Sequence, residues 1–307
     1  RQLGGAAAKP QTLMFAKFAP QGDRVAYVRE HNLYVERVSD NHVTALTTDG
    51  SRTTINGPFA WVYEDEFGAR DGFIDPGRLC SFFASAAAHE GVSFRYGREV
   101  VAAEETAGGY VLRTADGAAY EAPSVVIAAG AWSARVAALL GVEVPVEPVR
   151  RHLFLTGPVR DLPPVVPMTI DADTGVLVRR EGERVLVAWS NADEPPGFST
   201  TCDPEFVLRF ADALSARFPS VAAAGIDQRR SWAGLYEVTP DHHAILGPVP
   251  GRPGLLLVTG FSGHGVMHAP AAGRCVAEMV LLGRSESVDV SALSLSLACE
   301  ALATGVD

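Results

Sequence analysis

Hydrophobic and polar residues alternate between residues 13 and 63, which is the pattern of half-buried β-strands. Val25 and Tyr27 share one face of an early strand, and Leu33 and Val35 share one face of the next. A third short strand follows and ends in an Asp-Gly turn. This part of the chain is therefore predicted to be all-β, and its spacing resembles one blade of a β-propeller.

The pattern changes from period two to helical period at Asp75, an N-cap residue that is followed by Pro76 at the first helical position. Gly91 stands where the helix is expected to end. Apolar residues lie on one face of this helix, namely Leu79, Phe82, Phe83 and Ala86. The spacing predicts an amphipathic helix between the two signals.

Strands and helices then alternate to the end of the chain, which predicts an α/β fold, or mixed α+β. Residues 124–130 form a near-continuous apolar run, as in a parallel strand buried on both faces. A buried strand at 254–260 precedes a glycine-rich loop and a final helix. Other strands are expected at 92–97, 98–106, 109–117, 118–123, 152–157, 175–180 and 183–190, with helices at 131–141 and 203–219.

The composition excludes several classes of function. The net charge of −10 opposes binding to nucleic acid or anionic membranes, which needs clustered Lys and Arg. Apolar runs are strand-sized, well short of the roughly 20 residues that span a bilayer. The four cysteines form no CxxC pair, so we expect reduced thiols, a cytoplasmic location and no metal site.

The first segment resembles the propeller domain of the dipeptidyl peptidase IV family over about residues 12–73, with "WVYEDEFG" at 61–68 as its most specific motif. The resemblance implies that two neighbouring acids among Glu64, Asp65 and Glu66 bind a peptide's free amino terminus. Carboxylates suit an ammonium group, although a solvated acidic cluster explains the same residues. The chain carries no Gly-x-Ser-x-Gly nucleophile elbow, so no hydrolysis is expected.

The second segment resembles the FAD-dependent amine oxidoreductases of the D-amino-acid oxidase superfamily, nearest the sarcosine oxidase β-subunit and glycine oxidase. Four motifs carry the resemblance: "GFIDPGRL" at 72–79, "VVIAAGAWS" at 125–133, "WAGLYEVTPDHHAILG" at 232–247 and "TGFSGHGVMHAPAAGRCVAEMV" at 259–280. We therefore divide the chain into residues 1–71 and 72–307. The second part is expected to hold a partial FAD-binding domain and an antiparallel substrate domain at about 143–240.

The resemblance implies non-covalent FAD, and the glycine loop before the last helix suits it because that helix end presents free N–H groups. A structural turn would leave the same signal. The resemblance places FAD against these residues: Val100, Val101, Ala129, Gly130, Trp132, Gly234, Gly263, His264, Gly265, Val266 and Met267. Ordinary strand packing is the alternative for the first five.

The resemblance further implies oxidation of the C–N bond of a small amine or amino acid of the sarcosine, glycine or D-amino-acid type. Candidate substrate residues are Arg151, Tyr236 and His264, with His152 as a further one. Since His242 and His243 are adjacent, a strand would point them to opposite faces.

One expected part of the FAD site has no counterpart in the sequence. No Gly-x-Gly-x-x-Gly turn follows a predicted strand, so nothing here matches the family's first phosphate-binding unit. We expect a chimera of two partial domains that meets near 70–73. A partner chain would supply the missing unit; otherwise the fusion is inactive, or acts as a peptide-binding fragment.

Overall fold

The structure is a computed structural model that describes residues 13–18, 23–29, 32–40, 42–45, 75–160, 168–190 and 193–304. The chain separates into two compact units, residues 1–72 and 73–307. Glu64, Asp65 and Glu66 lie outside the described residues. No helix in the described part is long and apolar enough to cross a bilayer.

The first unit contains a four-stranded antiparallel meander in the order β1-β2-β3-β4. Its strands are β1 (Leu13–Phe18), β2 (Arg24–Arg29), β3 (Asn32–Arg37) and β4 (Val43–Ala45). Val25 and Tyr27 are buried, which confirms that the alternation in β2 marks a core-facing side. The ring of Tyr27 stacks on that of Tyr34 in β3 at a centroid distance of 5.8 Å.

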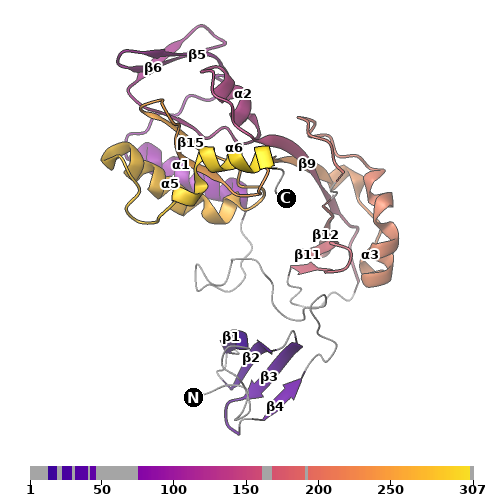
Figure 1. Ribbon diagram of the computed structural model, residues 1–307. Helices are drawn as coiled ribbons and strands as arrows, with labels where there is room; N and C mark the ends of the chain where they lie inside the picture. The colour runs from indigo at the N-terminus through magenta and orange to yellow at the C-terminus, as the bar shows by residue number, and fades with distance from the viewer. Residues whose placement is uncertain are drawn as a thin grey trace. The chain divides into compact units, whose positions relative to one another are not determined.

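The second unit is built around a short sheet in the order β14-β15-β8, from β14 (Ile245–Pro248), β15 (Leu255–Thr259) and β8 (Val125–Ile127). β15 pairs parallel with β8 and antiparallel with β14. Leu255 and Leu257 are fully buried among core residues. Helices α5 (Gly265–Leu282) and α6 (Leu295–Thr304) lie near this sheet (Figure 1).

β8 lies at the end of this sheet in the described part of the chain, so one of its edges carries no strand. Ile127 is buried as expected, but Val126 is 39% exposed. The expectation of a strand buried on both faces is therefore wrong for β8, because burial of both faces requires covering elements on each side.

Helix α1 (Pro76–His89) begins where the sequence signals place it, because Asp75 Oδ1 accepts a hydrogen bond from the Arg78 amide at 3.0 Å. None of its residues is buried, however, and Phe82 is 66% exposed. The strand that the sequence pattern predicts at 92–97 is absent. A strand forms only against a hydrogen-bonding neighbour, and the described residues provide none here.

A five-stranded antiparallel sheet in the order β10-β11-β12-β9-β13 forms the other half of this unit. The long strand β9 runs from the half that holds β15 to the half that holds β11 and β12 (Figure 1). The strands of this sheet are β9 (Glu147–Leu155), β10 (Thr169–Ile170), β11 (Leu177–Glu181), β12 (Arg184–Ala188) and β13 (Trp232–Val238).

One face of this sheet is covered by short helical segments rather than by the single helix expected at 203–219. They are η3 (Phe206–Arg209), α3 (Ala211–Arg217) and α4 (Pro219–Ala223). Phe210, at the junction, has φ −126° and is non-helical. The helix is interrupted because Phe206, Phe210 and Leu214 all pack into one buried cluster against the sheet.

The remaining elements join or extend the two halves. β5 (Val100–Thr106), β6 (Gly109–Thr114) and β7 (Ala119–Ala122) form a separate antiparallel sheet. The turn η2 (Gly130–Trp132) and helix α2 (Ser133–Ala138) follow β8. Short turns η4 (Gln228–Arg230) and η5 (Ser291–Leu293) precede β13 and α6.

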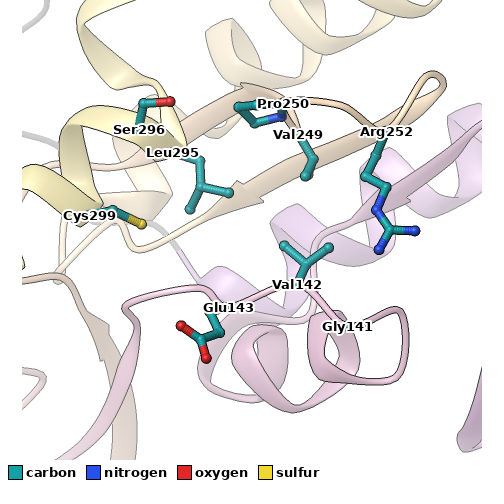
Figure 2. A pocket seen from close by; sticks show the side chains of 9 residues that line it. All are labelled: Gly141, Val142, Glu143, Val249, Pro250, Arg252, Leu295, Ser296 and Cys299. Atoms are coloured by element: carbon teal, nitrogen blue, oxygen red, sulfur yellow. The ribbon is translucent and has the colours of Figure 1, made fainter.

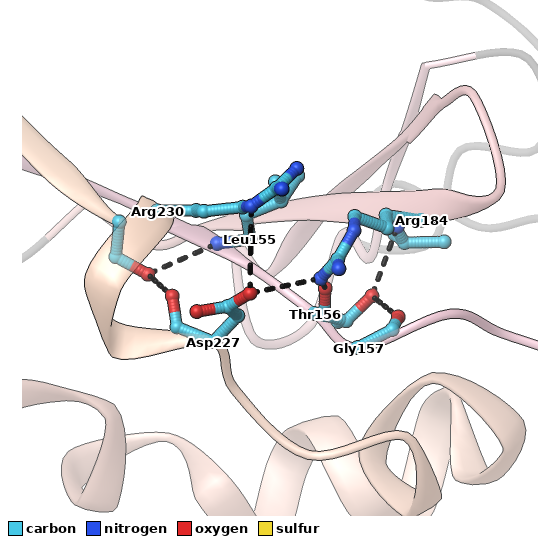
Figure 3. Close-up of polar contacts among 8 residues, drawn as sticks. Leu155, Thr156, Gly157, Arg184, Asp227 and Arg230 are labelled. Atoms are coloured by element: carbon cyan, nitrogen blue, oxygen red, sulfur yellow. Dashed lines mark hydrogen bonds and ion pairs between the residues drawn. The ribbon is translucent and has the colours of Figure 1, made fainter.

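A polar cluster fixes the end of β9 (Figure 3). The Arg184 guanidinium donates to the Thr156 carbonyl at 2.7 Å and to Asp227 Oδ2 at 3.1 Å. Thr156 is fully buried, and its hydroxyl accepts from the Val185 amide at 2.9 Å and donates to the Gly157 carbonyl at 2.7 Å. These contacts set the position of the strand that carries the candidate site.

Candidate active site

The pairing of β9 with β13 places an arginine beside an open glycine. Arg151 lies directly opposite Gly234, while Tyr236 and Trp232 flank Gly234 on the same face of the sheet. A Cβ at Gly234 would meet no atom within 4 Å, so the space above it is empty. Tyr236 is 39% exposed and Trp232 is 46% exposed, so the face is aromatic and accessible.

The Arg151 guanidinium is only partly satisfied. One terminal nitrogen donates to the Arg150 carbonyl at 3.2 Å, and the guanidinium carbon lies 5.5 Å from the centroid of the Tyr236 ring. The buried Nε has no hydrogen-bond partner among the described residues. Burial lowers the pKa of Arg151, while Tyr236 and Glu194 act to raise it. Arginine stays protonated at neutral pH, so this is a cation with a free donor.

The glycine loop between β15 and α5 approaches this face. Gly263 has φ +98°, and a Cβ there would lie 2.4 Å from Cε2 of Tyr236. The Tyr236 ring therefore lies directly against the loop. The first turn of α5, which includes Gly265, Val266 and Met267, receives no side-chain cap from His264. Its N–H groups and the positive end of the helix dipole suit an electron-rich ligand.

His264 itself is engaged within the loop. Its Nδ1 lies 3.2 Å from the Phe261 carbonyl oxygen, and its ring stacks on that of His268 at a centroid distance of 6.1 Å. The prediction that His264 contacts the substrate remains untested.

Turn η2 brings a third segment to the site, since it contacts β9, β13 and β15. The Thr259 hydroxyl donates to the Gly130 carbonyl at 3.3 Å, and Gly130 has φ +52°. Trp132 is 48% exposed. Ser133 is fully buried, yet its hydroxyl has no partner in the described part of the chain. Ser133 lies in the motif at 125–133, although it was not named as a site residue. Trp232 was not named either, but its period-two spacing with Gly234 and Tyr236 would have identified it.

Several predicted site residues therefore lie close together: Arg151 opposite Gly234, Tyr236 against Gly263, and Gly130 and Trp132 in η2, which contacts β9 and β13. Ala129 directly precedes η2, and His264, Gly265, Val266 and Met267 directly follow Gly263 in the chain. Val100 and Val101 do not belong to this group. They begin β5 in the separate sheet, and Val101 is 48% exposed.

His152 is a core residue, so its proposed substrate role is wrong. Strand alternation points it away from Arg151, and its ring stacks on Phe206 at a centroid distance of 4.2 Å. It is 2% exposed, and neither ring nitrogen has a partner among the described residues. Burial is the main cause that lowers the pKa of His152, with Arg150 contributing. His242 and His243 occupy a turn rather than a strand, with φ +58° at His242.

A cavity of about 350 Å³ lies elsewhere in this unit, and none of the predicted site residues lines it (Figure 2). Arg252 projects toward it but is already paired with Glu105 at 2.5 Å and with the Leu140 carbonyl at 3.1 Å. Its other walls include Val142, Glu143, Val249, Leu295 and Cys299.

The glycine loop, η2 and the arginine-bearing sheet meet where the two halves of this unit join. The chain belongs to the FAD dependent oxidoreductase (DAO) family, whose profile matches residues 21–279. Members of this family depend on FAD. The match begins well before residue 72, where we expected the resemblance to start.

The chain is similar to several curated proteins. The chain is 29% identical to FAD-dependent oxidoreductase domain-containing protein 1 of Xenopus laevis, over 88% of this chain and 61% of that protein. It is 31% identical to glycine oxidase of Geobacillus kaustophilus, over 68% of this chain and 54% of the relative. D-amino acid dehydrogenase of Xanthobacter autotrophicus is also 31% identical, over 71% of this chain and 51% of the relative. The chain thus spans less than two thirds of these relatives.

Solved structures support the fold. L-proline dehydrogenase from P. horikoshii superposes with a TM-score of 0.66 at 24% identity, over 74% of this chain and 60% of that one. Glycine oxidase from Geobacillus kaustophilus superposes with a TM-score of 0.61 at 27% identity, over 71% and 56%. The mixed α/β fold with antiparallel sheets is thereby confirmed.

Proposed function

We propose that this chain forms the substrate half and part of the cofactor half of an oxidoreductase that oxidises the C–N bond of a small amino acid or N-methyl amino acid. The observation that carries the proposal is Arg151, a half-buried cation whose guanidinium is only partly bonded and which lies opposite the empty space over Gly234. A substrate carboxylate fits this arrangement. A hydrogen bond to a charged group contributes about 1.5–3 kcal/mol.

The residues present fit the ring end of a flavin. The glycine loop admits close approach, and the buried Ser133 hydroxyl lacks a partner in the described structure. When bound, FAD would accept the hydride from the substrate carbon that bears the nitrogen, as the C–N single bond becomes a C=N double bond. The residues that would hold it are Gly130, Trp132, Gly263, Gly265, Val266 and Met267. Positions 233–235 carry no cysteine, so attachment there is not expected.

Tyr236 and Arg151 have separate roles in binding the substrate. Arg151 binds and orients the carboxylate, while Tyr236 packs between Arg151 and the glycine loop and keeps the two at a fixed separation. Trp232 and Tyr236 supply apolar walls that exclude water from the reacting bond.

The phosphate end of FAD needs a further unit, which we propose a partner chain supplies. Three features of the described residues support this: β8 has no strand on one edge, the face of α1 is exposed, and residues 92–97 pair with no strand. A strand and helix placed there would cover all three. The alternative is a fusion that binds no flavin and is inactive.

A peptide-binding role for the first unit is our second proposal. The meander β1–β4 supports it, because a propeller blade has four antiparallel strands. An X-Pro dipeptide should then bind, and Glu66→Gln should weaken that binding, as calorimetry would show. Unchanged affinity in the variant would remove this proposal.

The main proposal is tested by flavin absorbance near 450 nm after mixing with FAD, followed by anaerobic addition of sarcosine, glycine, proline or a D-amino acid. We expect a bound band that bleaches with one of these substrates. Arg151→Met should retain the band and lose bleaching, whereas Arg229→Met, at an exposed arginine, should bleach normally. FAD at 100 times its Kd should stabilise the fold by about 2.7 kcal/mol. Absence of both band and stabilisation would reject the proposal for this chain.

A further inference from the structure

Residues 193–201 form a strap that follows β12 and runs along β9. Glu194 is 6% exposed in its side chain and pairs with Arg150 Nε at 2.7 Å. Arg150 also donates to the Thr201 carbonyl at 3.0 Å, so one guanidinium holds both ends of the strap. Between these points the Gly197 amide donates to the Pro148 carbonyl at 2.7 Å. The backbone of the strap is therefore fixed to the substrate sheet.

One side chain of the strap reaches the cofactor half. The Phe198 ring lies 5.5 Å from the Trp132 ring, measured between centroids, and the Arg135 guanidinium carbon lies 3.6 Å from the Phe198 centroid. A cation over a ring face and a tilted aromatic pair are both attractive. Phe198 thus contacts η2 through Trp132 and α2 through Arg135.

Turn η2 is held from its inner side by the bond from Thr259 to the Gly130 carbonyl. Phe198 contacts the side chain at the other end of the same turn. Since Trp132 remains 48% exposed, packing by neighbouring core residues does not fix it.

We propose that Phe198 is a positioning residue that holds η2 and the start of α2 in the conformation that receives the cofactor. The strap thereby couples the substrate sheet to the cofactor turn. This inference rests on the proposed function for its purpose, but its physical content, the restraint of 129–139 by Phe198, is independent of any bound flavin.

Hydrogen exchange of the intact chain without flavin tests the restraint. Phe198→Ala should speed exchange of the amides in 129–139 by roughly tenfold, because the lost contacts correspond to about one decade in an opening equilibrium. Phe198→Leu should recover part of the protection. Leu208→Ala, at a leucine that is 70% exposed on η3, is the matched control and should change nothing. The α5 peptide, 265–282, should exchange as in the unsubstituted chain.

A second experiment measures the Kd for FAD and tests whether the restraint by Phe198 affects cofactor binding. Phe198→Ala should raise the Kd for FAD roughly tenfold, and Phe198→Leu should restore most of it. If no form binds FAD, the proposed function fails while the exchange result still decides the restraint. Exchange of 129–139 that stays within twofold in Phe198→Ala would overturn the inference, as would an equal loss of protection in α5, which reports general destabilisation.

Discussion

The contact between Gly263 and Tyr236 gives the sharpest test of the site geometry. In Gly263→Ala the new Cβ would lie 2.4 Å from Cε2, 2.8 Å from Cζ and 3.1 Å from the hydroxyl oxygen of Tyr236. The backbone there has φ +98°, a conformation that alanine disfavours. Both effects act against the folded state, and only the first depends on Tyr236.

The two contributions differ in origin and can be separated. A positive φ costs a non-glycine residue about 1–2 kcal/mol, and overpacking costs about 1–3 kcal/mol. The loss in unfolding free energy for Gly263→Ala is therefore about 2–5 kcal/mol. Gly251→Ala is the control, because Gly251 has φ +72° with no atom within 4 Å of a Cβ, so only the backbone cost of about 1–2 kcal/mol applies.

The assay is denaturant unfolding followed by tryptophan fluorescence. Replacing Trp61 by Phe in every variant leaves Trp132, Trp189 and Trp232, all in the second unit, as reporters. In a double-mutant cycle, Gly263→Ala placed on Tyr236→Ala should cost no more than Gly251→Ala, since the obstructing ring is gone. The coupling energy should then be about 1–3 kcal/mol.

Two results would refute this reasoning. One is a loss for Gly263→Ala no larger than that for Gly251→Ala. The other is a coupling energy below about 0.5 kcal/mol, the limit within which independent sites add. Either would mean that the Tyr236 ring is not held firmly against the glycine loop.

Further predictions concern stability and pH. Because burial keeps the pKa of His152 below its unfolded value near 6.5, protonation favours unfolding, and stability should fall as pH drops below about 6.5. His152→Phe should remove that dependence. The free energy of unfolding of the variant, measured with denaturant, should therefore rise relative to that of the unsubstituted chain from pH 7.5 to pH 5. A difference between the two that does not change with pH would contradict this. Thr156→Val removes a buried hydroxyl bonded to the Val185 amide and should cost about 1–3 kcal/mol by thermal or chemical unfolding, whereas the exposed Thr304→Val should change stability by less than about 0.5 kcal/mol. Glu278 accepts from the Ser287 side chain and amide and from the Glu286 amide, which lowers its pKa to about 2. The stabilisation of the folded chain by the Glu278 carboxylate should be complete above about pH 4.5 and lost as pH falls through about 2. Glu278→Gln should speed amide exchange at 286 and 287 already at neutral pH.

Local signals in the sequence located the elements whose stability is local. Asp75 and Pro76 marked the start of α1 because capping depends on neighbouring residues alone. The apolar run at 255–259 identified a buried strand for the same reason. Residues 92–97 had a strand's pattern but no strand formed, since pairing depends on a neighbour elsewhere in the chain. The interruption at Phe210 likewise follows from how Phe206 and Leu214 pack on the sheet.

The candidate site was predictable in its members more than in its geometry. The glycine loop and Arg151 stood out as residues, but only the register of β9 against β13 sets Arg151 opposite Gly234. The same register separates Arg151 from His152, which adjacency in the sequence had grouped together. The strap and Phe198 gave no signal, because a loop phenylalanine has no period from which a contact can be inferred.

The parallel pairing of β8 with β15 has a consequence for biosynthesis. Val125 pairs with Leu255, and the entire five-stranded sheet lies between them in the chain. The ribosome therefore synthesises the five-stranded sheet before the second strand of this pair exists. Closing so long a loop is entropically costly and slow, so we infer that the antiparallel half folds first during translation. Until β15 is synthesised, both edges of the apolar strand β8 are unpaired. Chaperone binding during this period would prevent β8 strands of different chains from associating.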